Sequence, residues 1–154
     1  MNLVAELPAG LTGLEQLQQM LANGRVAPIG ETLGFRLLEV EEGRVVFEGV
    51  PGVHAYNPIG TVHGGYAATL LDSACGCAAH SRLGANQAYT TLELKVAYHR
   101  AMTASTGPVY AEGRVLTIGR RAAFTEATIK DAAGKLYASA TSTLLVFERE
   151  AAGG

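Results

Sequence analysis

Residues 63–84, HGGYAATLLDSACGCAAHSRLG, decide the fold of this chain. They show no alternation of apolar and polar residues, and they are long enough for about five turns of helix before a predicted stop at Gly84. Most of the side chains are small, which lets a sheet approach the helix closely. These small residues are Gly65, Ala67, Ala68, Ser73, Ala74, Gly76, Ala78 and Ala79. We therefore predict a central helix that is buried on most sides.

Segments with a period of two flank this helix on both sides. Upstream, residues 33–41 and 44–50 form a predicted hairpin that turns at Glu42-Gly43. Downstream lie four predicted strands, at residues 90–100, 108–118, 121–131 and 135–147. The turns at Gly119-Arg120 and Ala132-Ala133-Gly134 predict that the last strands form an antiparallel meander. In the strand at 90–100, one predicted face carries Leu92, Leu94, Val96 and Tyr98, opposite Glu93, Lys95 and His99.

The predicted architecture is α+β, with one long helix wrapped by a curved antiparallel sheet of about five to six strands. A shorter amphipathic helix at residues 12–23 precedes it, with Leu14, Leu17, Met20 and Leu21 on one face. The chain divides into this helix and its lead-in at 1–30, the main domain at 31–148 and a tail at 149–154. An open sheet leaves apolar edges, so we expect copies of the chain to join edge to edge or helix to helix.

The composition predicts one folded domain that binds neither nucleic acid nor membranes. Of the 154 residues, 48% are hydrophobic, which supplies a substantial core. The formal net charge of −2 argues against a nucleic-acid partner and gives no electrostatic reason for membrane attachment. The first residues do not resemble a signal peptide, and no run reaches the roughly 18 apolar residues that a membrane span needs. We expect a cytoplasmic protein.

The two cysteines, Cys75 and Cys77, stand two residues apart within the predicted helix. Their side chains would point about 200° apart, which disfavours a mutual disulfide or a shared metal site. We expect both to be reduced packing residues. Because no Cys/His or acidic cluster occurs elsewhere, the sequence predicts no metal and no cofactor.

The start of the central helix is suited to polar chemistry. The loop at residues 51–62 leads into Gly64 and Gly65, and the first N–H groups of a helix lack partners within the helix. Without side chains, these glycines let a ligand oxygen come close to the free donors. The helix dipole adds partial positive charge, which would stabilise negative charge developing on a carbonyl oxygen.

Asp72 stands among small and apolar residues in the middle of the helix, where a carboxylate is costly to bury. Composition leaves two interpretations open, a surface carboxylate and a catalytic base. Gly64 and Asp72 are eight residues apart, or about 12 Å along a helix axis. One chain therefore cannot bring both to the same reacting carbonyl, whereas two antiparallel helices from neighbouring subunits can.

The stretch from Asn57 to Asp72, with the core Gly-Thr-Val-His-Gly-Gly at residues 60–65, resembles the signature of the phenylacetate-pathway (PaaI-type) branch of hotdog-fold thioesterases. That branch is similar to the 4-hydroxybenzoyl-CoA thioesterases. The resemblance covers about residues 30–147, because strand order and turn positions also fit. It implies a hotdog fold, hydrolysis of an acyl-CoA substrate, and dimers that pair into tetramers.

The resemblance also implies roles for individual residues. The Gly64 N–H would polarise the thioester carbonyl, and Asp72 would be the general base or the nucleophile. Asn57 would orient the carbonyl or the water, and the Thr90 hydroxyl would hold the attacking water. His63 would act in the site or, in the interpretation that we favour, cap the helix and fix the loop.

Further residues are candidates for binding the substrate. Gly65, Tyr66 and His54 would line the pocket, and Arg120 and Arg121 would contact the phosphates of coenzyme A. The acyl group stays open between aromatic and aliphatic. Two other functions on the same fold are an enoyl-thioester hydratase or dehydratase, which uses a histidine base, and a non-catalytic acyl-CoA-binding domain.

Overall fold

The central helix of this computed structural model, which describes residues 1–149, is α3 at Gly64–His80. Ten of its 17 residues are buried, among them Leu70, Leu71 and Ala74 with no exposed surface. The helix ends before the predicted stop at Gly84, because the Ser81 hydroxyl donates to the Ala78 carbonyl and accepts from the Gly43 N–H. The predicted central helix is confirmed.

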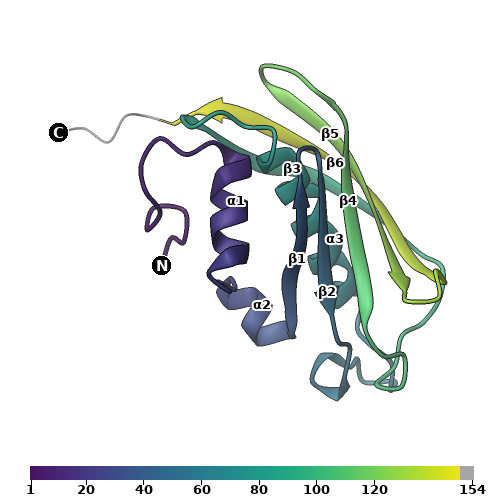
Figure 1. Cartoon of the computed structure of the whole chain (residues 1–154). Coiled ribbons are helices and arrows are strands. Elements are labelled where there is room, and N and C mark those ends of the chain that lie inside the picture. The colour runs from purple at the N-terminus through teal and green to yellow at the C-terminus, as the bar shows by residue number, and fades with distance from the viewer. Residues whose placement is uncertain (150–154) are drawn as a thin grey trace.

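Six antiparallel strands wrap this helix in one curved sheet (Figure 1). The strands are β1 at Phe35–Glu41, β2 at Arg44–Gly49, β3 at Gln87–Tyr98, β4 at Val109–Ile118, β5 at Ala122–Asp131 and β6 at Leu136–Glu148. Their spatial order is β1-β2-β4-β5-β6-β3, so the predicted meander is confirmed for the last three strands and β3 lies at the far edge. This arrangement is the α+β hotdog fold.

The face predicted for β3 is wrong at Leu92. A bulge between Thr91 and Glu93 inserts one residue opposite β6, where Thr91 pairs with Leu144 and Glu93 pairs with Thr143. Beyond a bulge the alternation of faces shifts by one residue. Leu92 is therefore 59% exposed, although Leu94 is packed against the core as predicted.

Two helices cover the edge of the sheet formed by β1 (Figure 1). Helix α1, Gly13–Ala22, begins with a capping box in which Thr12 and Glu15 satisfy each other's N–H groups. Helix α2, Pro28–Leu33, was not predicted, although Pro28 at its start and Gly34 at its left-handed end are typical helix signals. The start of α1 lies against the end of α3, where a Cβ on Gly13 would stand 1.8 Å from the His80 carbonyl oxygen.

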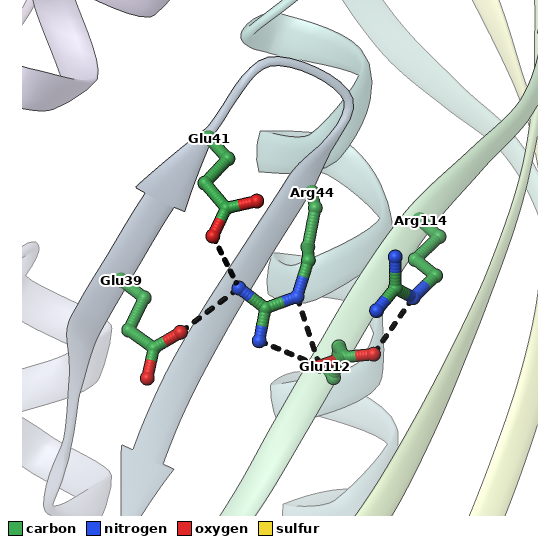
Figure 2. Close-up of polar contacts among 5 residues, drawn as sticks. All are labelled: Glu39, Glu41, Arg44, Glu112 and Arg114. Carbon is green, nitrogen blue, oxygen red and sulfur yellow. Dashed lines mark hydrogen bonds and ion pairs between the residues drawn. The ribbon is translucent and has the colours of Figure 1, made fainter.

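The opposite face of the sheet, turned away from α3, carries a network of charges (Figure 2). Arg44 on β2 bonds Glu39 and Glu41 of β1 at 2.9 and 3.0 Å, and Glu112 of β4 at 2.8 Å. Partial burial acts to raise the pKa of Glu112, but hydrogen bonds from Arg44 and Arg114 lower it below the ordinary value. The network links three neighbouring strands on a solvated face.

Candidate functional site at the start of the central helix

His63 is the N-cap of α3. Its Nδ1 accepts the Gly65 N–H at 2.8 Å, and its own N–H donates to the Ala55 carbonyl at 2.7 Å. The neighbouring Val62 N–H donates to Met102, in the segment that follows β3. His63 thus fixes the approach of the loop to the helix, and the N–H of Gly65 is occupied by this cap.

Gly64, the first residue of α3, keeps its N–H free of any acceptor among residues 1–149. Its carbonyl accepts the Tyr98 hydroxyl at 2.8 Å. A Cβ at Gly64 would stand 3.0 Å from atoms of the Tyr98 side chain, a tight contact that a small shift of this exposed ring relieves. The free N–H at the positive end of a 17-residue helix is suited to bind a carbonyl oxygen.

Asn57 organises the loop before the helix. Its Oδ1 accepts the N–H groups of Ile59 and Thr61 at 3.1 and 3.2 Å, and its Nδ2 donates to the Thr61 hydroxyl at 2.9 Å. These bonds close residues 57–61 into a compact turn. The Asn57 side chain therefore positions the loop.

Asp72 lies half-buried, two turns along α3, beside β3. The Thr91 hydroxyl donates to its Oδ1 at 3.0 Å. Thr90, the hydroxyl expected from the sequence, is exposed and pairs with Leu145 on the outer face of the sheet. Sequence reasoning missed Thr91, because uninterrupted alternation from Leu94 would turn Thr90 toward the helix, and only the bulge after Thr91 reverses the two faces.

Asp72 and Gly64 do not meet within one chain. Both belong to the same uninterrupted helix, and their eight-residue spacing separates them by about 12 Å along its axis. A carbonyl that accepts the Gly64 N–H is out of hydrogen-bond reach of the Asp72 carboxylate of the same chain.

A surface depression of about 400 Å³ opens beside the start of α3. Its lining includes His63, Gly64, Ala67, Tyr98, Arg100 and Met102. The depression therefore combines the free backbone donor with one guanidinium group, which suits an anionic ligand that ends in a carbonyl group.

Tyr66 and His54 do not line this depression. Tyr66 is 3% exposed, and its hydroxyl has no partner among the described residues; burial raises its pKa to about 12. It packs against Gly49, where a Cβ would stand 2.5 Å from the hydroxyl oxygen. His54 instead contacts the Leu33 carbonyl through Nε2 at 3.0 Å and ties the loop to α2.

Arg120 and Arg121 are exposed in the turn between β4 and β5. The neighbouring Ile118 packs on a cluster that includes Ala79, at the C-terminal end of α3, and Leu83, three residues beyond that end. Within one chain both arginines are therefore at the opposite end of the helix from Gly64.

Two further properties concern the part of the chain that the structure describes. No group of three His, Cys, Asp or Glu side chains in residues 1–149 is arranged to hold a metal ion. No helix in the same range is long and apolar enough to cross a membrane.

Comparison with known proteins gives a consistent result. Residues 59–138 match the family model of the thioesterase superfamily. No protein of curated function matches the sequence. Among solved structures, the chain is similar to a thioesterase family protein from Silicibacter pomeroyi (28% identity, TM-score 0.75, 86% of this chain and 98% of that one covered).

Two other solved structures extend the comparison. The phenylacetic acid degradation protein PaaI from Thermus thermophilus is 29% identical, with a TM-score of 0.70 and coverage of 77% of this chain and 98% of that one. A Streptococcus mutans protein solved with bound acetyl-CoA is 25% identical, with a TM-score of 0.67 and coverage of 76% and 92%.

Proposed function

The chain belongs to the thioesterase superfamily, and on that premise we propose that it hydrolyses an acyl-CoA thioester at a site shared by two subunits. The observation that carries this proposal is the placement of a free Gly64 N–H and a half-buried Asp72 carboxylate on one helix, too far apart to act together in one chain. The acetyl-CoA bound to the Streptococcus mutans relative supports a coenzyme A thioester as the substrate.

Strand β3 supports the pairing of two subunits. It has 12 residues and lies at the edge of the sheet, with β6 as its only neighbour among the described strands. An unpaired edge of this length is a template for another strand. Antiparallel pairing of two β3 strands would bring two α3 helices side by side in opposite directions, with Gly64 of each beside Asp72 of the other.

The proposed mechanism begins with the thioester carbonyl oxygen accepting the Gly64 N–H of one subunit. Asp72 of the other subunit removes a proton from a water molecule as that water attacks the carbonyl carbon. The carbon–sulfur bond then breaks, and the leaving thiolate takes up the proton to give free coenzyme A. The Thr91 hydroxyl holds the Asp72 carboxylate in place. Direct attack by Asp72 through a mixed anhydride is the alternative path.

The arginines fit this arrangement through the partner subunit. In an antiparallel helix pair, the C-terminal end of one α3 lies beyond the N-terminal end of the other. Arg120 and Arg121 of one subunit would then flank the depression of its partner, where Arg100 already lies. These guanidinium groups are the proposed contacts of the coenzyme A phosphates.

The test is release of free thiol from acyl-CoA by the wild type and by Asp72→Asn. General base catalysis contributes roughly 10²–10⁴-fold, so turnover by Asp72→Asn should fall by at least about 10²-fold. Ser73→Ala, at the next residue of the same helix, is the matched control and should keep normal turnover. Near-normal thiol release by a folded Asp72→Asn protein would refute the proposal, and consumption of enoyl-CoA would favour the hydratase.

A further inference from the structure

A groove runs beneath residues 1–4 and α1, where α1 faces β1 and α3. It consists of two adjoining cavities of about 450 and 300 Å³. Both cavities are lined by Asn2, Val4, Leu17, Met20 and Cys77. Because these residues are shared, the cavities are two ends of one space, which we call the α1 groove.

The larger end of the α1 groove is apolar. Its walls include Val26, just before α2, together with Phe35 and Leu37 of β1 and Phe47 of β2. Arg25 and Arg36, the charged residues of this end, are exposed. A concave apolar space of this volume is suited to a hydrocarbon chain, because each methylene removed from water contributes to binding.

Asp72 lines neither end of the α1 groove, but residues that bound the smaller end are its neighbours on α3 and β3. It is lined by His80 and Tyr89, and Tyr89 packs on α3 at Gly76, where a Cβ would stand 2.5 Å from the Tyr89 hydroxyl oxygen. Gly76 is one helical turn from Asp72, and Tyr89 is two residues before Thr91 on the same face of β3. Burial chiefly, and then the charge of Asp72, raises the pKa of Cys77 to about 12. The carboxylate is therefore close to the mouth of the groove.

We propose that the α1 groove binds the aliphatic tail of the acyl group whose carbonyl lies at Asp72, which makes medium-chain to long-chain fatty acyl thioesters the preferred substrates. This inference rests on the function proposed above. Cys77 is five residues from Asp72, or about 7.5 Å along the helix axis. An extended chain advances about 1.2 Å per bond, so acyl groups of up to about six carbons, and phenylacetyl, stop short of the apolar end.

The first arm of the test compares acetyl-, hexanoyl-, decanoyl- and phenylacetyl-CoA as substrates in the thiol-release assay. In the wild type, kcat/KM for decanoyl-CoA should exceed that for acetyl-CoA by at least about tenfold. Met20→Trp fills the groove and should remove this preference by lowering kcat/KM for decanoyl-CoA to about the value for acetyl-CoA. Gln18→Trp, on the exposed side of α1, is the matched control and should keep the wild-type profile. Val26→Phe fills the apolar end independently, in case Met20→Trp does not fold.

The second arm measures binding without catalysis, by calorimetry with S-decyl-CoA and S-ethyl-CoA, thioethers that lack the carbonyl. The decyl compound should bind at least about tenfold more tightly to the wild type, and the filling variants should abolish the difference. If no acyl-CoA is hydrolysed but this difference is found, the groove stands and the proposed function fails. If hydrolysis occurs without a chain-length preference, the α1 groove proposal is overturned. It is also overturned if the preference persists in a folded filling variant.

Discussion

A histidine lies at each end of α3, and the two histidines are in opposite environments. At the N-terminal end, His63 is exposed, and the Gly64 N–H next to it has no acceptor among the described residues. At the C-terminal end, His80 is buried, and its Nε2 contacts the Gln16 side chain at 2.8 Å. Burial, with a smaller effect from the charge of Arg149, lowers the pKa of His80 to about 4. The difference is one of pairing: the N-terminal end keeps an unsatisfied donor, where we propose that the chemistry takes place, whereas the polar groups at the C-terminal end are paired and packed.

The largest effect expected at the open end comes from removing the Gly64 N–H. Gly64→Pro deletes this donor while keeping a residue that is favoured at the first position of a helix. Losing one oxyanion donor costs roughly 10²–10³-fold in turnover. Gly64→Ala is the control, because it adds the same Cβ beside Tyr98 but keeps the N–H. Equal turnover of the two variants in the thiol-release assay would show that the donor has no role.

At the closed end, acid should weaken the fold through His80. The folded protein keeps His80 neutral down to a pKa of about 4, whereas the unfolded chain protonates near 6.5. The stability that neutral His80 contributes is therefore nearly complete about one pH unit above 6.5, and between the two pKa values it falls by about 1.4 kcal/mol per pH unit as the pH decreases. Urea unfolding at pH 6.5 and pH 5 should show about 2 kcal/mol of loss in the wild type and a much smaller loss in His80→Gln. If the free energy of unfolding falls equally in both proteins between pH 6.5 and pH 5, His80 is not the group responsible.

A smaller effect is expected where β3 supports the carboxylate. Thr91→Val keeps the shape of the side chain but removes the hydroxyl that donates to Asp72 at 3.0 Å. A hydrogen bond to a charged group contributes about 1.5–3 kcal/mol, so kcat should fall roughly tenfold or more. Thr90→Val on the outer face should have normal activity. The reverse ranking of these two variants would restore the role predicted for Thr90.

The smallest effect concerns the contact behind Gly64. Tyr98→Phe removes the hydroxyl that donates to the Gly64 carbonyl at 2.8 Å. Because Tyr98 is 57% exposed, water replaces part of this bond, and we expect less than about 1 kcal/mol of lost stability by urea unfolding. If the free energy of unfolding falls by as much as the cost of burying an unpaired polar group, the Tyr98 hydroxyl anchors the whole loop before α3.

Much of the fold could be predicted from sequence because its signals are local. The small-residue stretch at 63–84 and the period of two in the strands depend on neighbouring residues, and both were confirmed. The bulge after Thr91 depends on the register against β6, a contact between residues about 50 positions apart, and the sequence pattern does not contain it. For this reason Leu92 was placed on the wrong face and the contact of Thr91 with Asp72 was missed.

The candidate site also combines local features with contacts between distant residues. The spacing of Gly64 and Asp72 follows from helix geometry alone, so sequence analysis could derive that one chain does not unite them. The surroundings of His54 and Tyr66 depend on distant elements: one contacts Leu33, and the other packs against Gly49. Residue type did not indicate those contacts.

The most direct test of the shared site is activity after mixing two inactive variants, Asp72→Asn and Gly64→Pro. In a two-fold symmetric dimer, each mixed pair contains one site with both wild-type groups and one site with neither. Random exchange of subunits should therefore restore about a quarter of wild-type thiol release. If the mixture stays as inactive as its components while mixed dimers are shown to form, Asp72 and Gly64 do not act across the subunit interface, and the account is wrong.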